Sequence, residues 1–337
     1  VSRIMPGALE GTTVVEVAGH VAGPYAGSLL GDLGCEVIKV ELPGEGDTHR
    51  GRNPKYKGYG PSFRALNRNK KSLTLNLKDA KGKEILYGLL SKSDVLLENF
   101  RPATRSKLGL DYDKVSSLNP GIVHCSISGY GRTGPMADMP GYDLIIQAYS
   151  GLMHLTGDPD GLPLRVGFSL VDLFAGMMAY GSVVTALHQR QVTGKGQLVE
   201  ASLLDGQVAA LSYHATAFLG TGVEPNRMGS GHPSLVPYQS FSSSDGYFIV
   251  GCANQGLWER LCHGIGRTDF LKDPRFATNT DRVKHREECV GGLAEIFEGE
   301  TTAHWVSLIA KSGVPCGPIN KVSEVVTDPQ VLARNMI

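Results

Sequence analysis

The aspartate Asp172, near the start of an apolar helical stretch, could act in covalent chemistry because of its carboxylate and its small, apolar neighbours. The stretch from about Val171 to Gln191 is apolar and rich in small residues, and Asp172 falls in its first turn with no cation nearby in sequence. A carboxylate held ionised at a helix N-terminus, where small neighbours let a ligand approach, can act as a covalent nucleophile. A structural interpretation competes with this one: Ser169 would be the N-cap and Asp172 the N3 residue of a capping box. The residues alone leave both interpretations open.

The elements that would position Asp172 follow an α/β pattern. Residues 12–17 are typical of a buried strand, 23–34 of a helix with proline in its first turn and glycine at its end, and 35–40 of a second strand. Such a β-α-β unit implies a parallel sheet with a right-handed crossover. The turn after the first strand lacks GxGxxG, so a nicotinamide dehydrogenase ranks last among the alternatives. Further strands are predicted at 73–77, 94–100 and 122–127, with a helix at 79–91.

Ligand-binding residues are expected at the carboxyl ends of these strands, where open α/β sheets place their sites. Asn99 and Phe100 end one strand. Three cations follow directly, namely Arg101, Arg105 and Lys107. The polar stretch 43–69 carries further cations, and its length is typical of functional or disordered loops. This charge would suit a phosphate-bearing ligand.

Composition excludes several classes of function. The 337 residues contain 33 Lys and Arg against 33 Asp and Glu, so there is no general electrostatic case for binding nucleic acid or an acidic membrane. No apolar run approaches the roughly 18–20 residues that span a bilayer, and the start of the sequence does not predict a signal peptide. The six cysteines show no paired spacing. We expect buried free thiols in a reducing compartment.

The chain is long enough for two domains. Residues 220–233 are punctuated by glycine and proline, which is typical of a linker. We predict a large domain over 1–221, a smaller α+β domain over 222–325, and the start of a return segment toward the large domain over 326–337. The smaller domain is expected to contain a strand at 246–251 and helices at 257–265, 281–297 and 302–312.

Seven motifs in order carry a resemblance to a known family. They are His20 to Gly34, Glu36 to Gly46, Asn67 to Ser72, Glu98-Asn99-Phe100, Gly141-Tyr142-Asp143, Asp172 followed by Thr193-Gly194-Lys195-Gly196-Gln197, and Val314-Pro315-Cys316-Gly317-Pro318. The set resembles the class III (formyl-CoA transferase-like, CaiB/BaiF) coenzyme A transferases over nearly the whole chain. The segment from His232 to Gln239 makes it most similar to the succinyl-CoA:dicarboxylate branch, such as the glutarate-accepting enzymes.

The resemblance implies a fold, a partner and a compartment. It implies an α/β protein with a Rossmann-like parallel-sheet large domain, a smaller α+β domain and an interlocked homodimer. The family's large domain is completed by a C-terminal tail, which would continue beyond Ile337. The expected compartment is the cytoplasm, or the mitochondrial matrix in a eukaryote.

The resemblance also implies roles for matching residues. The family's nucleophile corresponds to Asp172, which would form an aspartyl anhydride and then an aspartyl-CoA thioester. The donor would be succinyl-CoA, with the CoA thioester as a substrate, no permanently bound cofactor and no metal. Leu42 and Pro140 replace an arginine and a lysine of formyl-CoA transferase, so phosphate contacts would shift to Arg50, Arg101 or Arg105. The CoA-contacting positions correspond to His20, Val21, Leu75, Lys78, Asn99, Phe100, Lys107 and Tyr142.

Candidates for the acyl and acceptor site are Tyr142, Asp143, Gly229, Gly231 and His232. Tyr142 and Asp143 would equally serve as helix-start residues. The two glycines would fit a covering loop or a plain hinge. Arg165, Arg227 and His232 are candidate partners of the acceptor carboxylate, although isolated charges of this kind are more often surface groups.

Two other functions stay open at this stage. A 2-methylacyl-CoA racemase of the same fold uses a histidine where this chain has Tyr142, and tyrosine is a poor base near neutral pH. Exchange of solvent deuterium into a chiral 2-methylacyl-CoA would favour it. A CoA-binding protein without turnover would bind CoA and give no hydroxylamine-sensitive aspartyl adduct.

Overall fold

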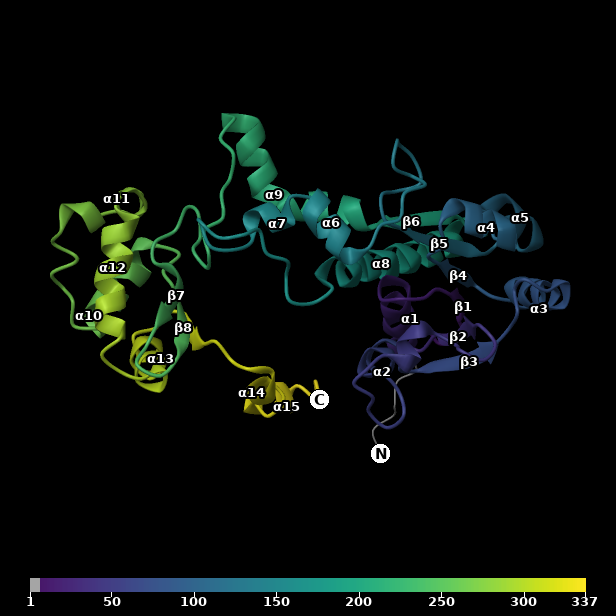
Figure 1. Ribbon diagram of the computed structural model, residues 1–337, viewed down its shortest axis with the longest axis horizontal. Coiled ribbons are helices and arrows are strands. Elements are labelled where there is room, and N and C mark those ends of the chain that lie inside the picture. The colour runs from purple at the N-terminus through teal and green to yellow at the C-terminus, as the bar shows by residue number, and fades with distance from the viewer. Residues whose placement is uncertain (1–6) are drawn as a thin grey trace. The chain divides into compact units, whose positions relative to one another are not determined.

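The computed structural model describes residues 7–337, which form two compact units (Figure 1). The larger unit comprises the described residues up to Thr156 together with Pro163–Pro225. The smaller unit comprises Gly157–Leu162 and Asn226–Ile337. The segment 157–162 therefore clusters with the smaller unit, although the predicted division assigned it to the large domain. The division at residues 221 and 222 stays a prediction.

The larger unit is built on a six-stranded parallel sheet in the order β3-β2-β1-β4-β5-β6. The predicted α/β class with a parallel sheet is confirmed. The strands are β1 (Thr13–Val17), β2 (Glu36–Glu41), β3 (Lys70–Thr74), β4 (Val95–Glu98), β5 (Val123–Ser128) and β6 (Leu198–Ser202). The helices of this unit are α1 (Ala22–Asp32), α2 (Pro61–Leu66), α3 (Ala80–Leu90), α4 (Pro102–Leu108), α5 (Tyr112–Leu118), α6 (Asp143–Tyr149), α7 (Leu152–Leu155), α8 (Leu170–Thr193) and α9 (Leu203–Thr221), with a short 3-10 turn η1 (Thr48–Gly51).

Helices cover both faces of this sheet, which explains why its central strands are continuous apolar runs. On one face, Val14 and Leu97 pack in a buried cluster with residues of α1 and α8. On the other face, Val15 and Leu96 pack with Leu86 of α3 and with residues of α5. Consecutive strand residues thus point into two separate cores, so the sheet is a rigid support for the loops at its carboxyl edge.

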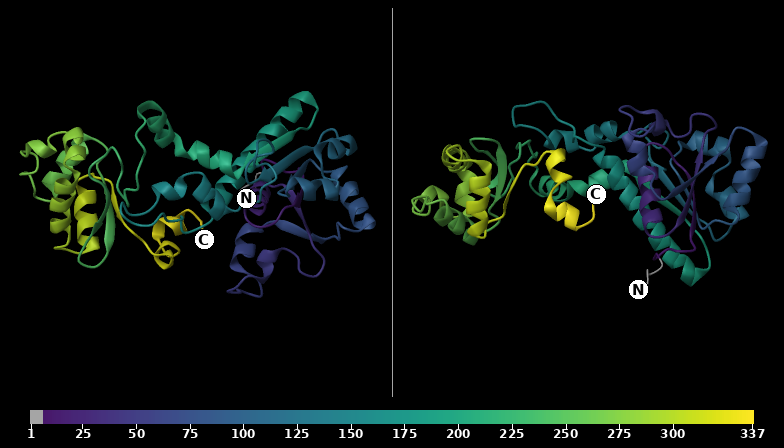
Figure 2. Two further views of the ribbon diagram at one scale, coloured as in Figure 1. Left: turned by 45° about the horizontal axis from the view of Figure 1, so that its top comes forward. Right: turned by 90° about the horizontal axis from the view of Figure 1, so that it is seen from below.

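Helix α8 lies along the sheet beside α1 (Figures 1 and 2). Its small residues allow this contact: a Cβ built on Gly176 would come within 2.7 Å of the Ala22 carbonyl oxygen. The helix is also long and apolar enough to cross a membrane by length and composition alone, contrary to the expectation that no run approaches that length. Val171, Ala175, Ala179 and Val183 are buried against the sheet cluster, as in the core helix of a globular unit.

Strand β3 begins earlier than predicted. The alternating stretch Leu73–Leu77 indicated a strand at 73–77, but the paired residues run from Lys70 to Thr74 beside Val37–Glu41 of β2. Pairing with the neighbouring strand fixes the register, and the buried side chains of Leu75 and Leu77 follow the strand and pack in the core. Tertiary pairing thus overrode the local alternation.

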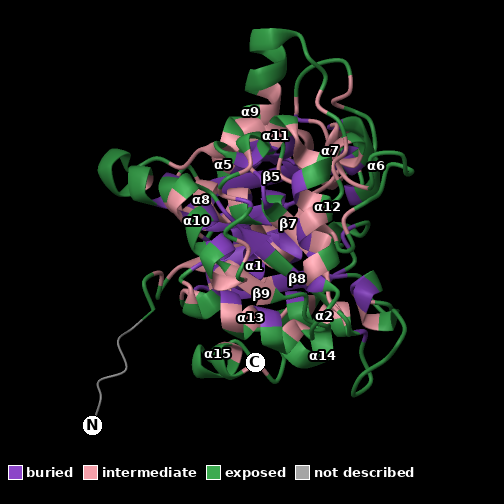
Figure 3. Cartoon of the chain, turned by 90° about the vertical axis from the view of Figure 1, so that its left-hand side faces the viewer, coloured by how far each residue is buried: buried purple, intermediate pink, exposed green. Residues whose placement is uncertain are grey.

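The smaller unit contains an antiparallel sheet in the order β7-β8-β9. Its core holds aromatic side chains, and the fully buried Arg282 lies 4.9 Å from the Trp258 ring centroid and donates to the carbonyl oxygens of Val236 and Phe276. Figure 3 colours such buried residues purple. Its elements are β7 (Tyr238–Ser242), β8 (Tyr247–Gly251), α10 (Gln255–Gly264), η2 (Pro274–Phe276), α11 (Asn279–Lys284), α12 (Arg286–Phe297), α13 (Thr302–Lys311), β9 (Cys316–Pro318), α14 (Val322–Val325) and α15 (Pro329–Ala333).

All six cysteines are free, and five of them are buried. This outcome agrees with the expectation of unpaired thiols. Burial raises the pKa of the Cys35 thiol to about 11, so this side chain is a core group rather than a reactive thiolate.

Candidate active site

A cavity of about 390 Å3 opens at the carboxyl edge of the parallel sheet, within the larger unit. Its size falls in the range of small-molecule sites. The walls come from the loop after β1, from the β4–α4 junction, from the loop between β5 and α6, and from the start of α8. Seven of the predicted site residues line it, namely His20, Asn99, Phe100, Arg101, Arg105, Tyr142 and Asp172. Residues far apart in sequence thus meet where an open α/β sheet places its ligands.

Asp172 enters this cavity from the first turn of α8. The predicted capping box is wrong, because the Ser169 side chain makes no capping hydrogen bond. Instead Oδ1 of Asp143, from α6, accepts hydrogen bonds from the N–H groups of Val171 at 2.9 Å and Asp172 at 3.3 Å. Asp143 therefore caps the helix, which releases the Asp172 side chain from that task.

Asp143 is itself held on its far side. Its Oδ2 accepts a hydrogen bond from the Gln147 side-chain amide at 2.6 Å, and the amide oxygen of Gln147 accepts one from Val166 N–H. The Asp143 side chain is buried, and Asp143 is not among the residues that line the cavity. The structure thus places this predicted acyl-site residue one layer behind Asp172, where it fixes the start of α8.

The electrostatic setting of Asp172 favours its neutral form. Burial raises the pKa of this carboxyl, and the nearby Asp143 charge raises it further, to about 7. No hydrogen bond to the Asp172 carboxylate occurs within residues 7–337. A poorly solvated carboxylate with a pKa near neutrality is present in both forms at pH 7 and is a stronger nucleophile than a solvated one.

The loop between β5 and α6 is closed at its neck by two glycines. A Cβ built on Gly129 would lie 2.6 Å from the Gly141 Cα, so neither position has room for a side chain. The Gly129 carbonyl also accepts a hydrogen bond from Leu204 N–H of α9. This close approach anchors the cavity-lining residues between them to the segment that carries Tyr142 and Asp143.

Asn99 ties the loop after β1 to the end of β4. Its side-chain amide donates to the Gly19 carbonyl at 2.9 Å and accepts from Gly19 N–H at 3.1 Å. The next residue, His20, has a left-handed backbone with φ of 62°. Its ring meets those of Tyr142 and His49 edge to face, at centroid distances of 5.8 and 6.2 Å. Tyr142 is 60% exposed, so its ring is available to a ligand.

Arg105 is the most buried cation of the cavity wall. It is 7% exposed and lies near the fully buried Glu98, with 3.8 Å between NH1 and Oε1. His124 Nε2 approaches the same oxygen at 3.5 Å, and Glu98 Oε2 accepts a hydrogen bond from Phe100 N–H. Glu98 was named as part of a motif but given no role, although a charged residue that ends an apolar strand is a signal for one.

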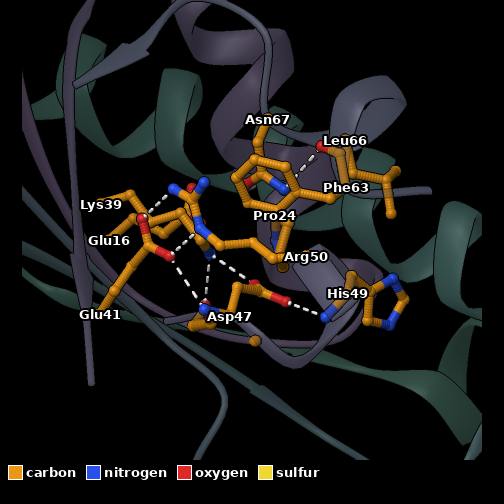
Figure 4. A network of polar contacts seen from close by, with 12 residues as sticks. Glu16, Pro24, Lys39, Glu41, Asp47, His49, Arg50, Phe63, Leu66 and Asn67 are labelled. Atoms are coloured by element: carbon orange, nitrogen blue, oxygen red, sulfur yellow. Dashed lines mark hydrogen bonds and ion pairs between the residues drawn. The ribbon is translucent and has the colours of Figure 1, made fainter. Parts of the chain in front are cut away.

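A second polar cluster lies at the carboxyl ends of β1 and β2 (Figure 4). The Lys39 ammonium binds Glu16 at 2.8 Å and Asp47 at 3.0 Å, and Lys70 binds the other oxygen of Glu16 at 2.8 Å. All four side chains are almost completely buried. We call Glu16, Lys39, Asp47 and Lys70 the buried ion cluster. Two cations against two carboxylates balance its formal charge.

Arg50 belongs to the edge of this cluster and is already engaged. Its Nε and NH2 both donate to the Glu41 carboxylate at 2.7 Å, and its guanidinium lies 3.9 Å from the Phe63 ring centroid. Because the Arg50 guanidinium is engaged by Glu41 and Phe63, it is not a candidate for a phosphate contact. The acidic Glu41 also accepts from Ser72 Oγ and Asp47 N–H.

Four other predicted CoA contacts do not line the cavity. Val21 precedes α1 as its N-cap residue. The Leu75 side chain is buried in the sheet core, and Lys78 is exposed. Lys107 lines a separate, shallower hollow with Lys83 and Tyr87. A role for these four residues would require backbone contacts or an extended ligand.

Three predicted acyl-site residues belong to the smaller unit. Gly229 has a left-handed backbone with φ of 59° and donates its N–H to the Gly157 carbonyl. Gly231 N–H donates to Met228. His232 accepts at Nδ1 from Ser234 N–H, and its ring meets Tyr238 at 5.4 Å. These contacts describe an ordered turn of that unit.

Within residues 7–337, no group of three or more His, Cys, Asp and Glu side chains could hold a metal ion. The cavity instead brings together one poorly solvated carboxylate, guanidinium groups and aromatic rings. This arrangement suits an anionic ligand with an electrophilic carbon near Asp172.

Comparisons with known proteins agree with this chemistry. The model of CoA-transferase family III matches residues 9–337. Succinyl-CoA:glutarate CoA-transferase of Homo sapiens is 42% identical over 330 residues, which are 98% of this chain and 75% of that protein. Acetyl-CoA:oxalate CoA-transferase of Acetobacter aceti is 39% identical, covering 98% and 85%. A solved CaiB/BaiF family protein from Brucella suis is 41% identical with a TM-score of 0.89, covering 98% of this chain and 89% of that one.

Proposed function

The chain belongs to CoA-transferase family III, and we propose that it moves CoA from succinyl-CoA to a small dicarboxylic acid through covalent intermediates on Asp172. The setting of Asp172 carries this proposal: a carboxylate in a cavity wall, with its pKa raised to about 7 by burial and by Asp143. The donor and the acceptor class are taken from the names of the relatives, of which one acts on glutarate.

The proposed reaction needs no energy input, because one thioester is exchanged for another. An Asp172 oxygen attacks the carbonyl carbon of succinyl-CoA, the C–S bond breaks, and CoA leaves as a thiolate, which gives a mixed anhydride of Asp172 and succinate. The thiolate attacks the Asp172 carbonyl carbon, releases succinate and forms an aspartyl-CoA thioester. The acceptor carboxylate then attacks that carbon and displaces the thiolate. Attack of the thiolate on the acyl carbon of the new anhydride gives the product and restores Asp172.

Burial of Asp172 supports this sequence in two ways. A carboxylate without hydrogen-bond donors keeps its nucleophilicity. The same partial burial keeps water away from the anhydride and the thioester, both of which would otherwise hydrolyse. The fixed cap from Asp143 holds the first turn of α8 in one position while these intermediates form.

Most of the residues proposed to bind the CoA part line the same cavity as Asp172. Asn99 and Phe100, at the end of β4, and Tyr142 and His20, from the facing loops, line the cavity. Arg101 and Arg105 supply positive charge for phosphate groups. Val21, Leu75, Lys78 and Lys107 are proposed as contacts outside the cavity, and Gly229, Gly231 and His232 as acyl-site residues.

We propose that the protein is an interlocked homodimer. Helices α6, α8 and α9 expose large apolar side chains that a partner chain would cover. These residues are Leu144, Ile145, Tyr149, Phe174, Met177, Val208, Tyr213, Phe218 and Leu219. Light scattering after size exclusion tests this directly, and a mass of one chain at micromolar concentration would contradict it. A cytoplasmic or mitochondrial-matrix location is proposed from the free cysteines and the resemblance.

Mass spectrometry of quenched enzyme tests the mechanism. During exchange with succinyl-CoA and glutarate, we expect an acyl group or CoA on the peptide that contains Asp172, removable by hydroxylamine. The Asp172→Ala variant should carry neither group and should still bind CoA. Exchange by this variant at a rate comparable to that of the natural chain would overturn the proposal.

A further inference from the structure

Arg132, a cation of the cavity wall, has a buried nitrogen without a hydrogen-bond partner in the described part of the chain. Arg132 lies in the loop between β5 and α6 and lines the same cavity as Asp172. Its NH1 atom is buried and makes no hydrogen bond. The Arg105 guanidinium in the same wall differs, because it lies beside the carboxylates of Glu98 and Asp111. A buried donor without an acceptor is destabilising unless a ligand supplies one.

The position of Arg132 is tied to that of Asp172. The contact of Gly129 with Gly141 closes the loop that carries Arg132. The same loop leads into Asp143, which caps the helix that carries Asp172. Three short connections therefore link the loop that carries Arg132 to the first turn of α8, which carries Asp172.

Arg132 and Asp172 do not pair with each other. No ion pair within 4.0 Å joins them in residues 7–337. Burial and the Asp143 charge account for the raised pKa of Asp172, and no cation counteracts them. The two groups line one cavity, and a ligand that spans them needs an anionic group at the end beside Arg132.

We propose that Arg132 binds the remote carboxylate of the dicarboxylic acid whose other carboxylate reacts at Asp172. This inference rests on the proposed function and names the residue that selects its acceptor. A planar guanidinium offers two parallel N–H groups to a carboxylate, and such a pair would satisfy the buried NH1 atom. A monocarboxylic acid of the same length leaves that atom unsatisfied, so the enzyme rejects it.

The succinyl donor carries the same remote carboxylate. Arg132 therefore acts in both half-reactions, and it would recognise the acyl chain rather than the CoA part. Free CoA lacks this carboxylate, so its affinity is independent of Arg132. The Kd of CoA therefore distinguishes the two possible roles of Arg132, because only a phosphate-binding role would make that Kd depend on Arg132.

The test compares Arg132→Gln with the natural chain on two acceptors of equal length, glutarate and pentanoate, at saturating succinyl-CoA. In a double-displacement reaction, kcat/KM for the acceptor reports only its reaction with the aspartyl-CoA form. We expect kcat/KM for glutarate to fall about 10–100-fold, with little change for pentanoate and for the Kd of CoA. Arg132→Lys should restore part of the preference, since it keeps the charge and loses the fork.

The control is Arg64→Gln, which removes an exposed arginine of α2 that lies outside the cavity wall. It should leave the glutarate preference unchanged. A raised Kd of CoA together with equal losses on both acceptors would assign Arg132 to a phosphate and overturn the inference. An unchanged preference would also overturn it. A natural chain that transfers CoA to no acid would instead contradict the proposed function.

Discussion

Asp172 and Glu41 are carboxylates of the same unit with opposite surroundings. Burial alone would raise the pKa of Glu41, but hydrogen bonds from Arg50, Ser72 and the Asp47 N–H outweigh it and lower the pKa to about 2. Burial also raises the pKa of Asp172, and the charge of Asp143 raises it further, to about 7. The supply of donors, rather than the extent of burial, separates the two groups.

This difference teaches where chemistry can be placed in the fold. Glu41 joins the buried ion cluster to Arg50 (Figure 4) and accepts a hydrogen bond from Ser72. Its charge is thus used in holding β2, β3 and the following loop together. Asp172 stabilises nothing with its own side chain, because Asp143 caps the helix in its place. A carboxylate without a structural task is available as a nucleophile.

The largest effect is expected from Asp172→Asn. The amide is of similar size and cannot form the anhydride, so kcat should fall on the order of 10^4-fold or more. The free energy of unfolding should not fall, because the variant removes a poorly solvated carboxylate. Steady-state exchange assays and urea unfolding measure the two effects on the same preparation.

The sign of the pH dependence follows from the raised pKa of Asp172. The folded state favours the protonated form, so stability is lost as pH rises from the ordinary aspartate value of about 4 through about 7. Asp172→Asn lacks this loss, and its stability advantage should grow between pH 5 and pH 8. A variant that is less stable than the natural chain at pH 8 would contradict the comparison.

Glu16→Gln, which lies outside the proposed catalytic cavity, is expected to lower the free energy of unfolding by a large amount. This change leaves Lys39 and Lys70 buried with Asp47 as their only carboxylate in the buried ion cluster. Breaking a buried pair from one side costs about 3–5 kcal/mol, measurable by urea unfolding. The control is Glu36→Gln, which breaks only the exposed pair with Lys71 and should cost about 0–1 kcal/mol.

A smaller effect, on pH dependence, is expected from Asp143→Asn. The amide oxygen can still accept from the start of α8, so the cap is largely kept, while the charge that raises the pKa of Asp172 is removed. Exchange requires ionised Asp172, so kcat rises with pH through about 7 in the natural chain. In the variant this acid limb should move to lower pH. If the acid limb of the kcat profile stays at the same pH in the variant, the Asp143 charge does not raise the pKa of Asp172.

Local patterns predicted the sheet well, since its strands are apolar runs punctuated by glycine and proline. They failed where a distant partner decides the outcome. The cap of α8 comes from Asp143, which lies 29 residues before Asp172, and no local pattern around Ser169 indicates it. Strand β3 is set by its pairing with β2, so the alternation at 73–77 was misleading.

The candidate site divides in the same way. Residues that directly follow a strand, such as Asn99 and Arg101, line the cavity as predicted. Arg132 was missed although it follows β5 by only a few residues, and the same rule would have identified it. Leu75 and Lys78 were assigned through the resemblance alone, and their side chains lie outside the cavity wall, because a matching position does not fix where a side chain points.

The smallest expected effect comes from Ser72→Ala, which removes one donor from Glu41 and leaves Arg50 in place. The free energy of unfolding at pH 7 should fall by about 1 kcal/mol, and exchange should be unchanged. The lost stability belongs to ionised Glu41, so it should shrink as pH falls toward about 2. Ser91→Ala, which removes an exposed hydroxyl bonded to Gly88, should change stability by less than about 0.5 kcal/mol. Equal losses of unfolding free energy in the two variants would show that the hydrogen bond from Ser72 stabilises Glu41 no more than a surface hydrogen bond would. The pKa difference between Glu41 and Asp172 would then have to be explained by burial.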